Sequence, residues 1–127
     1  MFKIDSEERV RSRLFYCLRI MHSFGLIHKD IKPANIAYSP SLGELVILDF
    51  GVSTFAKEEP GMLSETFREG TLKYMCPEMK KIGTSQAGFV DLYYNDVHSL
   101  ELTIIDLLNL RNQNDSINER LPEEGLE

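Results

Sequence analysis

The sequence predicts a small α+β fold. Three observations predict it: an amphipathic helix near the N-terminus, two short β-type runs between residues 35 and 48, and a strongly apolar helix over residues 94–110. With 127 residues, the chain can bury a single core of modest size.

The N-terminal helix has a start signal and a stop signal. Asp5 or Ser6 can cap it, Glu7 and Glu8 lie in the first turn, where the helix dipole favours acids, and Gly25 can end it. Its apolar positions recur at helical spacing and are Val10, Leu14, Cys17, Leu18 and Met21. An amphipathic helix of about 18 residues is therefore expected.

A hairpin and a long irregular segment follow. The β-type runs cover residues 35–38 and 44–48, and the five residues between them contain Pro40 and Gly43, which favour a turn. Residues 49–77 are rich in Gly, Ser, Thr and Glu. A loop of that length is usually functional or disordered.

The last predicted helix runs from Tyr94 to Leu110. It is apolar on most sides, which is typical of a helix inside a core. Its polar members need hydrogen-bond partners if they are covered, and they are Asp96, Ser99, Glu101 and Asp106. Residues 1–110 are thus expected to form the domain, and residues 111–127 a polar tail.

Composition excludes several functions. The chain has 14 Lys and Arg against 20 Asp and Glu, a net charge of −6, so no basic surface indicates nucleic acid or an anionic membrane. Cys17 and Cys76 stand far apart without metal-ligand spacing, no apolar run could span a bilayer, and no signal peptide is visible. An intracellular, cytoplasmic protein is expected.

Three sequence blocks carry the chemistry. His28–Asn35 reads HKDIKPAN and holds an aspartate, a lysine two residues later and an asparagine five residues later. Asp49-Phe50-Gly51 directly follows a strand of buried type, and Gly70–Glu78 reads GTLKYMCPE. Each block alone is weak, but some ten specified positions match in order and register.

Together the blocks resemble the catalytic loop, the magnesium loop and the end of the activation segment of eukaryotic-type protein kinases. The resemblance covers about residues 5–110. It implies a protein-kinase-like fold, present as an incomplete, mostly helical C-lobe, with the short hairpin carrying the catalytic and magnesium loops.

The resemblance also implies roles for individual residues. Asp30 would orient the substrate hydroxyl and accept its proton, and Lys32 would place a positive charge near the transferred phosphoryl group of ATP. Asn35 and Asp49 would bind Mg²⁺ through hard oxygen atoms. Thr71 would help to position the substrate.

Further residues would act structurally. His28 and Phe50 would stack under the active site, Gly51 would complete the magnesium loop, and Asp96 would hold the catalytic loop through its backbone, with helix capping as the alternative. Glu78 is paired with an arginine in the family; without that partner, we expect Glu78 to be exposed or the region around it to be mobile.

Lys32 and Thr71 resemble the Ser/Thr class rather than tyrosine kinases. Choline- and aminoglycoside-type kinases share the Asp–Asn spacing but lack the other two blocks. Ser64 and Thr66 lie where activation-loop phosphorylation falls in the family, and Lys29 could receive the phosphate.

The chain also departs from the family. Lys29 replaces an arginine, Cys76 replaces an alanine, and Glu101 stands where a small glycine is frequent, which is unfavourable on a buried helix. No glycine-rich loop or Val-Ala-x-Lys strand is present, so the small N-terminal lobe that covers ATP is expected to be missing, as are the later C-lobe helices.

Two functions follow. The first is a Ser/Thr protein kinase that transfers phosphate from Mg-ATP to a protein hydroxyl, as an incomplete domain that is inactive by itself and would need a missing N-lobe or partner protein. The alternative is a pseudokinase-like fragment that acts as a protein-binding module.

Overall fold

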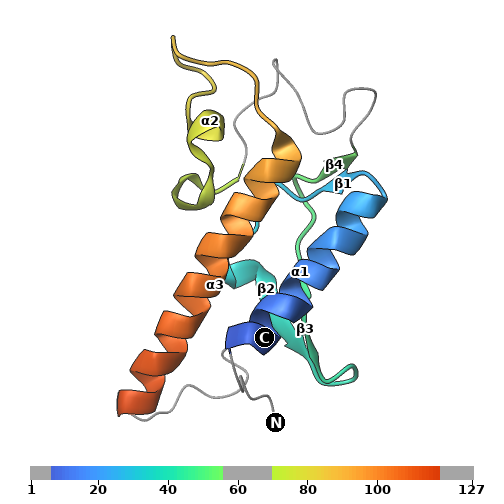
Figure 1. Cartoon of the computed structure of the whole chain (residues 1–127), viewed down its shortest axis with the longest axis vertical. Helices are drawn as coiled ribbons and strands as arrows, with labels where there is room; N and C mark the ends of the chain where they lie inside the picture. Colours follow the sequence, from blue (N-terminus) through green and yellow to red (C-terminus); the bar gives the residue numbers. More distant parts are fainter. Residues whose placement is uncertain (1–6, 56–69, 118–127) are drawn as a thin grey trace.

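The computed structural model describes residues 7–55 and 70–117, with side chains as far as Asn109. The helix cap predicted at Asp5 or Ser6 and the predicted phosphorylation sites Ser64 and Thr66 lie outside the described residues. Two long helices and a hairpin dominate the fold, as Figure 1 shows.

Helix α1 spans Glu7–Ser23 and confirms the first predicted helix. Its inner face buries Val10, Leu14 and Leu18, because side chains three and four residues apart share one side of a helix. Gly25 then adopts a φ of 76°, which ends the helix at low steric cost.

The predicted hairpin is also confirmed. Strand β2 (Ile36–Ser39) pairs antiparallel with β3 (Glu44–Ile47), in a register that places Ile36 opposite Ile47. Gly43 takes a φ of 67° in the turn. The hairpin packs against α1, with Leu45 and Ile47 in the core.

A second, shorter strand pair was not predicted. Strand β1 (Leu26–Ile27) pairs antiparallel with β4 (Thr54–Phe55), which lies in the segment expected to be irregular. This pairing returns the chain beside the start of the block His28–Asn35.

The end of the irregular segment is also more ordered than predicted. It contains the 3₁₀ turn η2 (Leu72–Tyr74) and leads into the helical turn α2 (Pro77–Lys80). Another 3₁₀ turn, η1 (Pro33–Asn35), precedes the hairpin. Pro33 and Pro77 both begin a helical turn, where the missing N–H is tolerated.

Helix α3 spans Leu92–Ile117, so it begins two residues earlier and ends seven residues later than predicted. It runs beside α1 in the opposite direction (Figure 1). The expected burial is confirmed for most of its described residues, but Tyr94 and Ile105 remain about half exposed. Among these residues, α1, η1, η2 and β1 cover only part of the helix surface.

Helix α3 connects two apolar clusters. The first joins α1, the hairpin and α3, and contains Val10, Leu14, Leu18, Ile31, Ile36, Leu45, Ile47, Leu100, Ile104 and Leu107. The second lies mainly over residues 75–92 and contains Ile27, Met75, Cys76, Met79, Ile82, Val90 and Leu92.

The four polar residues predicted to need partners on α3 all have them. Asp96 accepts a hydrogen bond from the backbone N–H of His28, and Ser99 donates one to the backbone oxygen of Tyr74. Asp106 accepts a hydrogen bond from the Tyr74 hydroxyl. Glu101, expected to be unfavourable, lies at the edge of the α1–α3 interface and accepts two hydrogen bonds from Arg11 at 2.9 and 3.0 Å. That expectation was wrong because the carboxylate is partly exposed and paired.

Within the described ranges, no helix combines the length and the apolar character that crossing a bilayer requires.

Candidate active site

The predicted catalytic loop, residues 28–35, is held by a fully buried carboxylate. Asp96, in the second turn of α3, accepts hydrogen bonds from the backbone N–H groups of His28 and Lys29, both at 2.9 Å. Lys29 has a φ of 74°, so the chain turns sharply here and presents consecutive N–H groups to one side chain. The role predicted for Asp96 agrees with these contacts.

Sequence analysis did not identify the third partner of this carboxylate. His22, in the last turn of α1, places Nε2 2.9 Å from Asp96 Oδ2, and its ring lies edge-on to Tyr93 at 4.7 Å. Because His22 and Asp96 are 74 residues apart, no local spacing could have revealed the pair.

His28 uses both ring nitrogens. Its Nδ1 accepts the backbone N–H of Asp30 at 3.0 Å, so Nε2 must carry the proton that is donated to Leu48 O at 2.8 Å. This assignment of the tautomer follows from the two partners. The imidazole therefore connects the catalytic loop to the residue before Asp49, and the Phe50 ring lies 5.0 Å from it.

Asp30, Lys32 and Thr71 form a compact triangle. Thr71 Oγ1 donates to Asp30 Oδ1 at 2.9 Å and accepts from Lys32 Nζ at 2.9 Å. Lys32 Nζ also lies 3.7 Å from Asp30 Oδ2. The structure thus brings together three of the predicted site residues from two segments about 40 residues apart, with the carboxylate fixed and still partly exposed.

A close backbone contact supports this triangle. Gly70 has a φ of 104°, and a Cβ atom at this position would lie 2.3 Å from the carbonyl oxygen of Lys29. Only glycine permits that approach. The glycine therefore allows Thr71 to reach Asp30.

Of the two predicted metal ligands, Asn35 directly precedes the hairpin in the chain and Asp49 follows it. Asn35 Nδ2 donates to the backbone oxygen of Asp30 at 2.7 Å, which leaves the amide oxygen Oδ1 as the atom available to a cation. Leu48 N donates to Asn35 O at 2.7 Å, so the backbone of Asn35 is joined directly to the residue before Asp49.

Asp49 is exposed and has a left-handed φ of 62°. Its Oδ1 accepts the N–H of Gly51 at 3.2 Å, the turn-type contact that lets aspartate tolerate this conformation. A carboxylate and an amide oxygen are the hard donors that Mg²⁺ takes from proteins, so the residues present fit the predicted ion.

A second polar cluster follows Thr71. Tyr74 OH donates to Asp106 Oδ2 at 2.6 Å, Lys73 Nζ lies 3.1 Å from the same oxygen, and Ser99 Oγ donates to Tyr74 O. The hydrogen bond from Tyr74 lowers the pKa of Asp106 below its ordinary value, while burial and the same bond raise the pKa of Tyr74. This cluster attaches the segment around Thr71 to α3.

The other predicted residues differ in their exposure to solvent. Glu78 is exposed, as expected for a carboxylate without a buried partner. Lys29 is buried at 7% exposure, and its predicted role toward a phosphate at Ser64 or Thr66 stays a prediction. Gly51 follows Phe50 in an exposed turn.

The family model for the protein kinase domain matches residues 2–121 of this chain. The chain belongs to the protein kinase family. The match includes all three sequence blocks and extends beyond residue 110, where the predicted resemblance ended.

Several curated protein kinases are similar to this chain. A probable serine/threonine-protein kinase of Dictyostelium discoideum is 41% identical over 80 residues, 60% of this chain and 17% of the relative. Mitogen-activated protein kinase kinase 9 of Arabidopsis thaliana is 35% identical over 91 residues, which are 72% of this chain and 28% of the relative. Serine/threonine-protein kinase PkaA of Streptomyces coelicolor is 35% identical over 78 residues, which are 60% of this chain and 14% of the relative. The chain therefore spans less than a third of each of these relatives.

Proposed function

We propose that this chain is the catalytic part of a serine/threonine protein kinase, which transfers the terminal phosphate of Mg-ATP to a hydroxyl group of a protein. The observation that carries the proposal is the triangle of Asp30, Thr71 and Lys32, with both distances to Thr71 Oγ1 at 2.9 Å. Membership of the kinase family and the names of the relatives support it.

Asp30 is the group that positions the attacking hydroxyl. Thr71 donates to Oδ1, so Oδ2 remains to accept a hydrogen bond from a substrate Ser or Thr. A carboxylate in this position orients the nucleophile and takes its proton as the phosphoryl group is transferred.

Lys32 supplies positive charge at the same place. Its ammonium lies between Thr71 Oγ1 and Asp30 Oδ2, so it can stabilise negative charge that develops on phosphoryl oxygens beside the attacked hydroxyl. Thr71 holds both groups in register, and we assign it a positioning role.

Asn35 and Asp49 would hold Mg²⁺. When bound, the ion neutralises the charge of the nucleotide phosphates. The chain's own contribution is orientation: the bond from Asn35 Nδ2 to Asp30 O ties the amide ligand to the catalytic loop, and the bond from Leu48 N to Asn35 O ties it to the loop that carries Asp49.

The proposal is tested on the native polypeptide that contains this chain, isolated with an antibody against a peptide of its sequence. We expect Mg²⁺-dependent transfer of labelled phosphate to serine or threonine of a protein substrate, and a loss of at least about 100-fold in Asp30→Asn. Equal activity of Asp30→Asn, or phosphate on tyrosine alone, would contradict it.

The 127-residue polypeptide by itself is expected to be inactive. Its sequence has no G-x-G-x-x-G pattern to cover nucleotide phosphates. Incubation of the purified chain with labelled ATP and Mg²⁺ checks this expectation, and transfer that is abolished by Asp30→Asn would overturn it.

A further inference from the structure

The buried carboxylate of Asp96 is in contact with a side chain that can carry a positive charge. His22 Nε2 lies 2.9 Å from Asp96 Oδ2, and the other two donors to this carboxylate are the backbone N–H groups of His28 and Lys29. Buried charges in proteins are ordinarily paired. Within residues 7–55 and 70–109, the His22 ring is the group that can place an opposite charge within hydrogen-bonding distance of Asp96.

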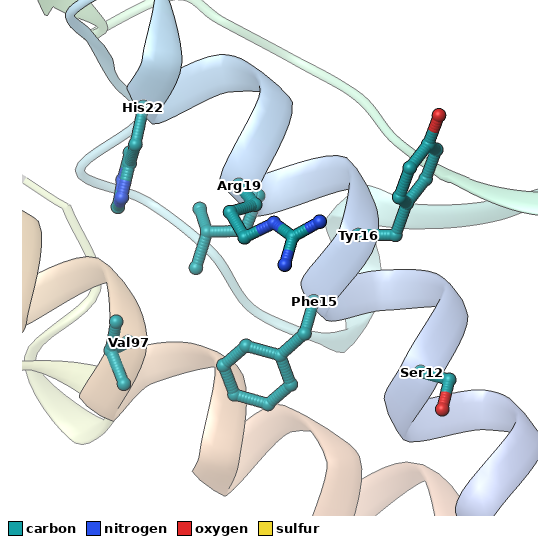
Figure 2. A pocket seen from close by; sticks show the side chains of 7 residues that line it. Ser12, Phe15, Tyr16, Arg19, His22 and Val97 are labelled. Atoms are coloured by element: carbon teal, nitrogen blue, oxygen red, sulfur yellow. The ribbon is translucent and has the colours of Figure 1, made fainter.

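The His22 ring has access to water. It lines a pocket between α1 and α3 (Figure 2), and its side chain is 17% exposed. Nε2 faces Asp96, and among the described residues Nδ1 has no hydrogen-bond partner, so Nδ1 is the atom that takes up a proton from water. Histidine ordinarily changes its charge between about pH 5 and 8. The contact therefore has two forms: a neutral ring donates one N–H to the carboxylate, and an imidazolium forms an ion pair with it.

The charges around this ring act in opposite directions. From α3, Asp96 attracts an imidazolium, and the Tyr93 ring lies edge-on at 4.7 Å. On α1, Arg19 lines the same pocket and repels a positive charge, whereas the carbonyl groups at the end of the helix favour it. Strand β1 is apolar, and Glu44 of β3 lies beside Arg13, about two and a half turns earlier in α1.

The contact bears directly on the geometry around Asp30. Asp96 holds the N–H of Lys29, whose backbone has a φ of 74°, and Asp30 is the next residue. The carbonyl group of Lys29 packs against Gly70, which precedes Thr71. A stronger hold on Asp96 therefore orders both of the segments that meet at the Asp30 carboxylate.

We propose that the His22–Asp96 contact is a pH-dependent lock on the loop of residues 28–35. At acid pH, the imidazolium holds Asp96 and, through it, the N–H groups of His28 and Lys29. As the pH rises and the ring becomes neutral, the contact weakens and the start of the loop opens more often, because charge-assisted hydrogen bonds are roughly twice as strong as neutral ones. The proposal concerns the loop itself and does not depend on phosphoryl transfer.

A second histidine predicts the opposite pH dependence, so the sign of the effect distinguishes the two. His28 Nδ1 accepts the N–H of Asp30 at 3.0 Å. A proton on that nitrogen would remove the acceptor, so titration of His28 would loosen the loop as the pH falls. Titration of His22 loosens the loop as the pH rises.

The test follows the backbone amides of His28 and Lys29 in the full 127-residue chain by NMR-detected hydrogen exchange, between about pH 5 and 8. Protection factors remove the intrinsic pH dependence of exchange, and the Cε1–H signals of the 3 histidines report the charge of each ring. We expect the protection of both amides to fall about fivefold to tenfold as the His22 ring loses its proton. The amides of β2 and β3 should stay unchanged.

Three variants separate the lock from other sources of pH dependence. His22→Gln keeps a side-chain N–H donor that does not titrate, so the protection of the two amides should not change with pH. His22→Phe keeps an aromatic ring beside Tyr93 but removes the donor, and should lower their protection at every pH. His98→Gln is the matched control: the His98 ring lies 6.2 Å from Tyr94 on α3 and makes no described contact with the loop, so the pH dependence should persist.

Several outcomes would overturn the proposal. Constant protection while the His22 ring titrates would show that its charge does not act on the loop, and a ring that keeps one charge throughout the range would remove the lock. Protection that falls toward acid pH would assign the dependence to His28. A dependence that survives in His22→Gln, or that the amides of β2 and β3 share, would assign it to another group or to the stability of the whole chain.

Discussion

Asp96 is the residue on which the geometry of the catalytic loop depends most. Two backbone donors and His22 converge on its carboxylate, which has no solvent exposure. Hydrogen bonds to a buried charge are strong, and an unsatisfied partner left behind is costly. The loop is thus positioned by a side chain that does not itself reach Asp30.

We expect Asp96→Asn to destabilise the chain by about 3 kcal/mol, because an amide would turn one N–H₂ toward a backbone N–H. Urea unfolding followed by circular dichroism measures the change. Asp91→Asn is the matched control: Asp91 is exposed, and its carboxylate accepts the N–H of Tyr94 at the start of α3, a capping contact that asparagine can also make. A similar loss in both variants would contradict the assigned role.

Asp106 should show a pH dependence that requires Tyr74. Because the hydrogen bond from Tyr74 lowers the pKa of Asp106 in the folded chain, its contribution to stability is present above about pH 4, the unfolded value, and is lost as the pH falls through the lower folded value.

We therefore expect Tyr74→Phe to raise the pKa of Asp106 and to reduce that acid-side contribution. NMR titration of the Asp106 carboxyl carbon measures it. An Asp106 titration that is unchanged in Tyr74→Phe would show that Lys73, which lies 3.1 Å from the carboxylate, accounts for the shift.

At the scale of elements, one glycine joins the end of the activation segment to the catalytic loop. In Gly70→Ala, the new methyl group would collide with Lys29 O at 2.3 Å, and a φ of 104° is strained for alanine. We expect a loss of about 2 kcal/mol and faster amide hydrogen exchange in η2. Gly88→Ala is the control, since nothing lies within 4 Å of its added methyl group; comparable exchange in the two variants would argue against the contact.

An ion pair between Arg11 and Glu101 also joins α1 to α3. Both Arg11 and Glu101 are more than a third exposed, at 38% and 44% of their side chains, so solvent screens the ion pair. A double-mutant cycle with Arg11→Ala and Glu101→Ala should give a coupling energy of about 0.5 kcal/mol. A coupling several times larger would mean that the pair, rather than the apolar contacts, fixes the two helices.

Over the whole molecule, the sequence predicted the elements with a clear period and missed the others. The spacing of Val10, Leu14 and Leu18 predicted α1, and two β-type runs separated by Pro40 and Gly43 predicted the hairpin. Strand β4 is only two residues long, too short for any period to show. Helix α3 passes its predicted end because the apolar pattern stops at Leu110, whereas no Gly or Pro interrupts the chain before Pro122.

The sequence predicted those site residues whose side-chain chemistry and spacing occur together in a short block. Asp30, Lys32 and Asn35 lie in one block, and Thr71 follows a glycine in another. The contacts of His22 with Asp96 and of Ser53 Oγ with His28 O were missed, as was Tyr74 as the partner that Asp106 was expected to need, because each contact joins segments far apart in sequence. A spacing rule cannot detect a contact that exists only after folding.

Helix α3 should make the two apolar clusters unfold together. It contributes Leu92 to one cluster and Leu100, Ile104 and Leu107 to the other. We expect Met79→Ala, at a position with no exposure, to destabilise the chain by about 2–5 kcal/mol and to shift the urea midpoint equally for probes in both clusters. A shift confined to residues 70–92 would indicate two independent units.

Asp49 and Asp96 would be lost at different rates if a descendant of this chain no longer needed its chemistry. Asp49 is exposed, has a left-handed backbone and makes one hydrogen bond of 3.2 Å, so Asn or Gly could replace it with little effect on folding. Asp96 cannot change without disturbing the loop. A decaying copy of this gene should therefore lose its proposed metal ligand long before it loses its fold, and an intact aspartate at position 49 is a more sensitive indicator of the proposed activity than Asp96.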